Sequence, residues 1–211
     1  MYRIIGINEN EQLKLIKKEA LNSGMQWMNS DPNQKKWPDS TIKANINGSS
    51  FLTNTTYMPS DWNEKIATTT WKYGDNSIYN TTAVNLYTTE NNWSTTISAK
   101  IGLMYAHDYY YAYQSNGLNC SYAGGNYSTC KTSWLHLSQN DSGSPHINEW
   151  TMGRHDGDAY GSFKPWCVTT NGNVSEATPT LWYSARPVFY LIKEVAYISG
   201  TGTSIDPFII Q

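Results

Sequence analysis

The sequence has little charge and no basic cluster. Charged residues make up 15% of its 211 residues, and the formal net charge is −2. A protein that binds duplex nucleic acid needs a basic stripe, so nucleic acid is not an expected partner. The chain also lacks a run of about 18 apolar residues, the length that a transmembrane helix requires. No membrane span is therefore predicted within these residues.

Two further absences concern targeting and catalysis. Met1, Tyr2 and Arg3 lead straight into a strand-like segment, without the apolar stretch of a signal peptide. This leaves two alternatives, an intracellular protein or a fragment of a longer one. The sequence also contains no Gly-x-Ser-x-Gly elbow, no phosphate-binding loop and no His-Glu-x-x-His motif. We therefore do not expect an enzyme.

The chain is instead rich in aromatic and uncharged polar residues. It contains 16 Tyr and 9 Trp against 4 Phe, and most of its polar residues are Asn, Thr, Ser and Gly. Tyrosine and tryptophan combine an apolar body with a polar group, which suits surfaces that are both wet and adhesive. This composition is typical of extracellular β-rich modules. The length predicts one domain, residues 1–211, with a single sizeable core.

The first third of the chain predicts helices. Tyr2–Ile7 is a short strand, after which Asn8 and Glu11 form a capping-box pattern at the start of a helix. Apolar residues then recur at helical spacing, at Leu13, Ile16, Ala20 and Leu21.

Two more helices are expected further on. Asp39 or Ser40 caps one helix, whose Ile42 and Ile46 face inward and whose apolar face resumes at Phe51-Leu52. Ser60 caps a short third helix through Trp62 and Ile66. Residues 8–70 are thus predicted to be mostly helical.

Short strands and long loops are predicted for residues 71–211. Ala99–Tyr105 is the strongest strand, and Asn171-Gly172-Asn173 between two apolar runs predicts a hairpin. The further strands are expected at Trp134–Leu137, Glu149–Met152, Phe163–Thr169 and Pro187–Ile198, and a turn at Gly200–Thr203 leads into a last strand, Phe208–Ile210. Helices followed by strands predict an α+β fold with a small, mostly antiparallel twisted sheet.

The cysteines suggest one structural bond. Cys120 and Cys130 enclose nine residues rich in Gly, Ser, Asn and Tyr, which offer little apolar material for packing. A disulfide closing about eleven residues would contribute roughly 3 kcal/mol and would imply an oxidising compartment. Two unrelated reduced thiols are the alternative. A zinc site is less favoured than either, because no second Cys/His pair with zinc-ligand spacing follows. Cys167 is predicted to be a buried strand residue, since a nucleophile would need a nearby histidine.

Several segments together resemble a domain of uncharacterised function found in surface and prepilin-like proteins of low-GC Gram-positive bacteria. They are YRIIGI with LKLIKKEA, STIKANINGSSFL, IGLMYAHDYYYAY, the Cys120–Cys130 loop leading into SWL, EWTM, ARPVFYL and SGTGTSIDPFII. The resemblance implies an extracellular module with a disulfide in its long loop, anchored to the cell surface or a pilus through a segment absent from this sequence.

The same layout is similar to the C-type-lectin and formylglycine-generating-enzyme-like folds. In these folds the two terminal strands lie together and long loops present the ligand face. The C-type-lectin-like arrangement is therefore the expected form of the α+β fold, with adjacent terminal strands.

Few residues suggest chemistry. His107 and Asp108 are adjacent as in a catalytic dyad, but on a strand their side chains would point to opposite faces. Arg186, which precedes Pro187, is expected to be structural, with its guanidinium on loop carbonyls or a carboxylate. The other histidines lie in predicted loops without metal-ligand spacing, at His136, His146 and His155. No catalytic or metal site is predicted from these residues.

Calcium is the one cofactor that the sequence brings into question. Asp156 and Asp158, on either side of Gly157, could supply oxygen ligands, but the EF-hand pattern fails beyond them. The Glu-Pro-Asn and Gln-Pro-Asp tripeptides of calcium-dependent C-type lectins are also absent. We therefore expect no cofactor, with calcium at these two carboxylates as the alternative.

Recognition by aromatic residues in polar loops is the function that the sequence favours. Tyr, Ser, Gly and Asn together give rigid contact area and adaptable hydrogen bonds, as in antibody loops. The expected ligand face, near the Cys120–Cys130 loop, comprises His155, Asp156, Asp158, Tyr160, Trp182 and Tyr183. The expected function is a non-enzymatic, extracellular adhesion domain of a bacterial surface that binds a protein or glycan ligand. The alternatives are a pilin-like structural subunit whose aromatics pack in a filament, and an oxidase of the formylglycine-generating type.

Overall fold

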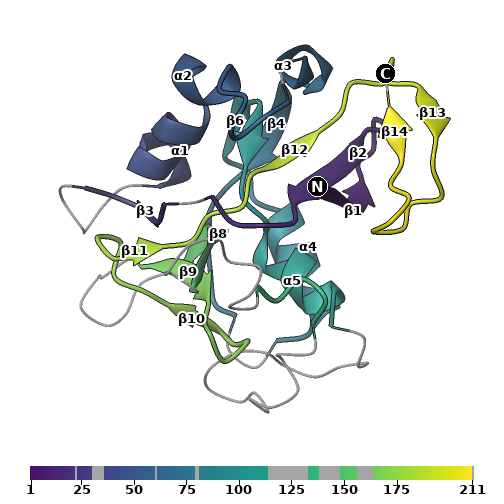
Figure 1. The fold of residues 1–211 in the computed structure, drawn as a ribbon. Coiled ribbons are helices and arrows are strands. Elements are labelled where there is room, and N and C mark those ends of the chain that lie inside the picture. Colours follow the sequence, from purple (N-terminus) through teal and green to yellow (C-terminus); the bar gives the residue numbers. More distant parts are fainter. Residues whose placement is uncertain are drawn as a thin grey trace.

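The computed structural model is a mixed α+β fold (Figure 1), and it describes residues 1–21, 23–29, 36–59, 61–78, 81–113, 133–137, 148–155 and 164–210. The predicted α+β class and the mostly antiparallel pairing are confirmed. Cys120 and Cys130 lie outside the described residues, as do Asp156, Asp158 and Tyr160. No helix among the described residues is long and apolar enough to span a bilayer.

A four-stranded antiparallel sheet joins the first and last thirds of the chain. Its order is β1 (Tyr2–Ile7), β2 (Leu13–Lys17), β12 (Val188–Tyr190) and β7 (Ile101–Gly102). Strand β2 is central and pairs with β1 on one side and β12 on the other. Segments from near both ends of the chain are therefore neighbours (Figure 1).

The predicted helix at residues 8–23 is wrong, because Leu13–Lys17 is strand β2. Asn8 caps a turn instead of a helix: its side-chain oxygen accepts hydrogen bonds from the backbone amides of Asn10 and Gln12, at 3.0 and 2.9 Å. The helical spacing of the apolar residues was misleading because a central strand is buried along most of its length. Pairing with β12, far away in sequence, decides the conformation here.

The second four-stranded sheet has the order β10 (Val174–Glu176), β9 (Pro165–Val168), β8 (Glu149–His155) and β5 (Asp75–Asn76). The predicted hairpin is confirmed, since β9 and β10 pair antiparallel across a turn in which Gly172 has a φ of 79°. Strand β5 pairs parallel to β8. Cys167 lies buried on β9, as predicted.

Three two-stranded sheets complete the strands. They are β3 (Met25–Gln26) with β11 (Trp182–Tyr183), β4 (Thr69–Lys72) with β6 (Thr96–Ala99), and β13 (Tyr197–Ser199) with β14 (Ile209–Ile210). Trp134–Leu137 forms no strand, which corrects that expectation. The predicted last strand is confirmed as β14, although its partner is β13 and not β1.

The helices only partly follow the expected distribution. A 3₁₀ turn, η1 (Trp37–Asp39), precedes α1 (Thr41–Ile46), α2 (Ser49–Leu52), α3 (Trp62–Lys65), α4 (Ala83–Asn91) and α5 (Ala106–Tyr111). The Ser40 cap is confirmed, because its hydroxyl accepts the Lys43 amide, and Ile42 and Ile46 are buried as expected. Helices α4 and α5 were missed. The strand expected at Ala99–Tyr105 is only β7, and α5 begins directly after Tyr105.

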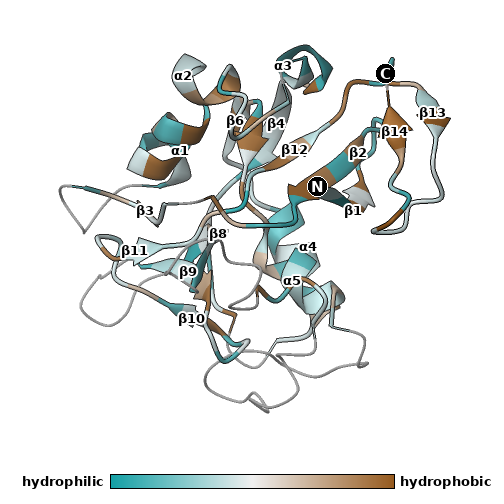
Figure 2. Ribbon diagram, viewed as in Figure 1, coloured by the Kyte–Doolittle hydropathy of each residue, from teal (hydrophilic) through white to brown (hydrophobic). Residues whose placement is uncertain are grey.

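The core is built around tryptophan. Five tryptophan side chains are almost fully buried, namely Trp27, Trp37, Trp71, Trp150 and Trp166. Gly102 of β7 lies against Trp71 so closely that a Cβ there would be 2.7 Å from the ring. Figure 2 shows hydrophobic residues along β2 and β12 within the body, and also on β14, where Ile209 remains exposed.

Arg186 is structural, as predicted. Its Nε and Nη2 donate to the two carboxylate oxygens of Glu149, both at 2.7 Å, and Nη2 also donates to the Leu135 carbonyl at 2.6 Å. Burial raises the pKa of Glu149 above its ordinary value, and the guanidinium of Arg186 offsets part of this effect. Both side chains are buried, so this pair joins β8 to two other segments in the interior.

Candidate functional site

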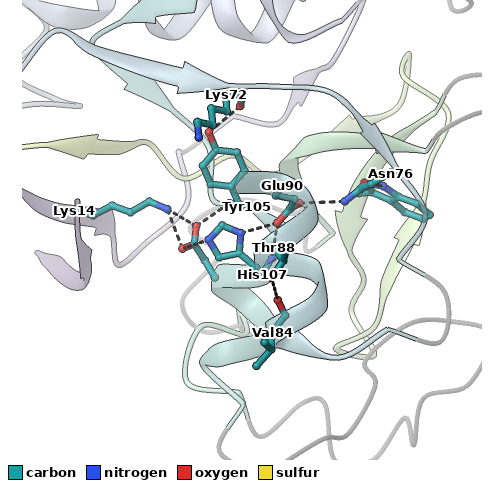
Figure 3. A network of polar contacts seen from close by, with 10 residues as sticks. Lys14, Lys72, Asn76, Val84, Thr88, Glu90, Tyr105 and His107 are labelled. Atoms are coloured by element: carbon teal, nitrogen blue, oxygen red, sulfur yellow. Dashed lines mark hydrogen bonds and ion pairs between the residues drawn. The ribbon is translucent and has the colours of Figure 1, made fainter. Parts of the chain in front are cut away.

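A polar cleft with a volume of about 630 Å³ lies between the first sheet and helices α4 and α5. We call it the polar cleft. The lining residues with charged or aromatic side chains that form its candidate site are Lys14, Tyr87, Glu90, His107, Asp108 and Tyr111. Strand β2 supplies the lysine, α4 supplies Tyr87 and Glu90, and α5 supplies the other three. The site therefore depends on three elements that are distant in sequence (Figure 3).

A buried ion pair lies at the base of this cleft. Lys14 Nζ is 2.8 Å from Asp108 Oδ1 and 2.6 Å from Oδ2. Asp108 is fixed because its Oδ2 also accepts a hydrogen bond from the backbone amide of Tyr105, at 2.8 Å, at the start of α5. Lys14 is fixed by its position on the central strand, and its ammonium lies 4.8 Å from the Tyr105 ring centroid.

Each charge of this pair shifts the pKa of the other side chain so that its ionised form is favoured. Burial alone would lower the pKa of Lys14, but Asp108 outweighs it, and the pKa lies above its ordinary value. Burial alone would raise the pKa of Asp108, but Lys14, assisted by His107, holds it below its ordinary value. The ionised forms are therefore the resting state of both side chains.

A second carboxylate extends the pair into a chain. Glu90 is buried in the last turn of α4, and its Oε2 is 3.0 Å from the backbone amide of His107 and 2.6 Å from His107 Nδ1. The other imidazole nitrogen, Nε2, is 3.5 Å from Asp108 Oδ1. We call Lys14, Asp108, His107 and Glu90 the charge chain. An imidazolium would donate to both carboxylates, because each of its nitrogens carries a proton.

This arrangement corrects one expectation. His107 and Asp108 were expected to point to opposite faces of a strand, where they could not pair. They lie on helix α5 instead, and the imidazole lies between the carboxylates of Asp108 and Glu90. Figure 3 shows the His107 ring between the charges that come from β2 and α4.

Aromatic side chains form the walls and rim of the polar cleft. The Tyr105 ring stacks on the His107 ring, with centroids 5.2 Å apart and an interplanar angle of 11°. Tyr87 meets the same imidazole edge-on at 5.1 Å. Tyr87, Tyr111 and Trp134 are 45%, 51% and 42% exposed, although all three line the cleft. Large aromatic faces are thus available to a ligand beside the buried charges.

The structure does not bring the described members of the predicted ligand face together. Tyr183 packs on Trp150 near the start of β8, with ring centroids 4.6 Å apart, whereas His155 is the last residue of β8. At about 3.3 Å per residue, the five steps from residue 150 to residue 155 span roughly 16 Å. Trp182 is 53% exposed on β11, while His155 is buried against Trp166. Asp156, Asp158 and Tyr160 lie outside the described residues.

Cys167 is the one cysteine among the described residues, and it is buried. Burial raises the pKa of the Cys167 thiol to about 12, which disfavours a reactive thiolate. Among the described residues, no group of three His, Cys, Asp or Glu side chains could hold a metal ion. The predicted disulfide, Cys120–Cys130, and the calcium alternative at Asp156 and Asp158 fall outside those residues.

Sequence reasoning missed most of the polar cleft. Neither Lys14 nor Glu90 was among the residues predicted to form a site. One signal was available: a lysine within the apolar run LKLI is unusual, because a charge in a buried strand needs a partner. The partner, Asp108, is separated from it by 94 positions and could not be inferred from local pattern.

A second cavity lies on the other side of β1. It has a volume of about 920 Å³ and is mostly apolar, and we call it the apolar groove; it is lined by Ile4, Leu13, Val195, Tyr197, Phe208 and Ile210. Both strands of the β13–β14 hairpin contribute to its wall. The exposed side chains of Tyr197, Phe208 and Ile209 make this hairpin an apolar surface.

Comparison of the chain with models of protein families, with curated proteins and with solved structures gives no match. The resemblance to the surface and prepilin-like domain therefore stays a prediction from sequence.

Proposed function

We propose that the protein is a non-enzymatic, extracellular binding domain whose polar cleft takes a neutral glycan. The observation that carries this proposal is the combination of three half-exposed aromatic side chains with hydrogen-bonding groups in one cleft, namely Tyr87, Tyr111 and Trp134. A sugar ring presents an apolar C–H face and an edge of hydroxyl groups. The C–H face can stack on the aromatic rim. The hydroxyl groups can donate hydrogen bonds to the asparagine and carboxylate oxygens of the cleft.

The charge chain supports binding more than catalysis. Each of its carboxylates already accepts several hydrogen bonds or ion-pair contacts within the protein. A general base must instead direct an available lone pair at a substrate. With these groups mutually satisfied, the charge chain serves as a rigid floor, and the aromatic rim provides the contacts.

The finer fold proposal is the C-type-lectin-like layout. It is supported by the sheet in which β1 and β12 flank β2, which brings the first and last thirds of the chain together. The pairing of β14 with β13 departs from the expected adjacency of the terminal strands. An extracellular, surface-anchored domain fits this layout and the aromatic composition.

A glycan array probed with the purified protein tests the proposed function. We expect binding that Tyr87→Ala or Tyr111→Ala reduces at least tenfold in titrations by calorimetry. Tyr197→Ala is the matched control, because Tyr197 is an exposed tyrosine outside the polar cleft, and it should leave affinity unchanged. Binding that depends on Trp182 instead would return the site to the face predicted from sequence, and no glycan binding would refute the proposal.

A structural, pilin-like subunit is the second candidate, and the apolar groove favours it. Ile4, Phe208 and Ile209 are about half exposed around this groove, and such patches mark protein contacts. Sedimentation over a range of concentrations should then reveal self-association that Phe208→Ser abolishes. A monomer at all concentrations would remove the support for this candidate.

A further inference from the structure

The floor of the apolar groove is the face of the first sheet that is turned away from the polar cleft. Along β2, Leu13 and Leu15 line the groove, whereas Lys14 between them lines the polar cleft, because side chains alternate between the faces of a strand. Ile4 of β1 pairs opposite Leu15 and extends the floor. Ile4 and Leu13 are 45% and 38% exposed, so a ligand can reach this apolar surface.

The β13–β14 hairpin forms the opposite wall of the groove. Tyr197 and Phe208 line the groove, and the Tyr197 ring meets the Phe208 ring edge-on, with centroids 5.9 Å apart. Gly202 has a φ of 79° and lies so close to the Phe208 ring that a Cβ there would be 2.5 Å from it. Within the part of the chain that the structure describes, the hydrogen bonds of residues 197–210 stay inside the hairpin. The wall is therefore braced by its own contacts and is not bonded to the floor.

The charged side chains at the groove are mostly basic. Among the described residues that line it, three side chains are cationic, Arg3, Lys18 and Lys193, and one is acidic, Glu11. Glu11 already lies 3.8 Å from Lys193, near the start of β2. Arg3 lies toward the other end of β2, and among the described residues its guanidinium meets no carboxylate: Nη1 donates to the Trp134 carbonyl at 2.6 Å. The donors on Nε and Nη2 remain for an anion.

We propose that the apolar groove binds a long-chain carboxylate, with its head group on Arg3 and its alkyl chain between the sheet and the hairpin. A guanidinium binds a carboxylate through two parallel hydrogen bonds. The five steps from Leu13 to Lys18 span roughly 16 Å, which gives room for an extended alkyl chain, and the volume of about 920 Å³ is typical of small-molecule sites. A second copy docked on this groove by a two-fold axis would bring the same cations together, whereas a carboxylate matches their charge. The groove lies on the far side of the sheet from the polar cleft, so this inference does not depend on the proposed glycan.

Calorimetric titration of the purified full chain with octanoate, decanoate and dodecanoate tests the apolar part of the site. Each added methylene group should strengthen binding roughly fourfold, which corresponds to about 0.8 kcal/mol for the burial of one CH₂. Dodecyltrimethylammonium has the same alkyl chain as a dodecyl carboxylate and the opposite charge, and it should bind at least tenfold more weakly than dodecanoate. An affinity that does not grow with chain length, or no binding of any of the three carboxylates, would overturn the proposal.

Substitutions separate the head group from the alkyl chain. Arg3→Gln should weaken dodecanoate binding at least tenfold and remove the preference over dodecyltrimethylammonium, whereas Phe208→Ser should weaken both ligands. Ile198→Ser is the matched control, because Ile198 is on the same hairpin and as exposed as Phe208 but does not line the groove. Tyr87→Ala, in the polar cleft, should leave dodecanoate binding unchanged, so a failure of the glycan proposal is distinguishable from a failure of this one.

Three results of these experiments would contradict the proposed carboxylate site. The first is an equal loss of dodecanoate binding in Ile198→Ser and Phe208→Ser. The second is binding to phosphatidylglycerol vesicles by a chain that does not bind dodecanoate, which would make the groove a membrane contact. The third is a self-associated chain in sedimentation that does not take up dodecanoate, which would make the groove an interface between copies.

Discussion

Replacing Arg186 by methionine should destabilise the protein strongly. The substitution leaves the carboxylate of Glu149 buried without the two donors that now lie at 2.7 Å, and it removes the donor of the Leu135 carbonyl. Removing one partner of a buried ion pair costs about 3–5 kcal/mol. For a chain of this length each kcal/mol lowers the Tm by roughly 2–4 °C, so we expect a fall of roughly 6–20 °C. Calorimetry and urea unfolding measure both quantities.

The double variant separates charge burial from packing. Arg186→Met combined with Glu149→Leu removes both charges, so it should recover most of the stability that the single variant loses. Lys193→Met is the surface control. Lys193 lies 3.8 Å from the exposed Glu11, and this substitution should change stability by less than about 1 kcal/mol. A single Arg186 variant as stable as this control would refute the reasoning.

A further prediction concerns Cys167. Because burial raises the pKa of Cys167 from 9.0 to about 12, the folded state holds this proton longer than the unfolded state. Stability should therefore fall as pH rises between these values, and urea titrations should show a smaller fall for Cys167→Ala; parallel profiles would contradict this.

Features defined by local chemistry could be predicted from the sequence. The Ser40 hydroxyl caps α1 because the residues that it bonds are three positions away, and Gly172 forms the hairpin turn for a similarly local reason. The role of Arg186 could also be inferred, since a buried guanidinium next to an apolar strand must find a carboxylate or carbonyls. The partners of Ser40 and Gly172 lie within a few residues, whereas the partners of Arg186 lie 37 and 51 positions away, so only their chemical type could be predicted.

Features decided by distant partners could not be predicted. The spacing of Leu13 and Ile16 fits a helix, but pairing with β12 makes the segment a strand that is buried on both faces. The tyrosine-rich segment after Tyr105 was interpreted as a continuing strand. Asp108 instead caps a helix there, and its second contact, Lys14, comes from β2. The candidate site was missed because it is made almost entirely of such long-range contacts.

Two buried ion pairs, Arg186–Glu149 and Lys14–Asp108, differ in whether they reach a cleft. The pair of Arg186 and Glu149 is closed: its donors meet a carboxylate and a carbonyl, and neither residue lines the polar cleft. The pair of Lys14 and Asp108 lines that cleft and continues to His107. Apolar residues would stabilise either position about as well. Stability alone therefore does not account for a charge chain that opens onto a cleft, whereas recognition of a ligand in that cleft does.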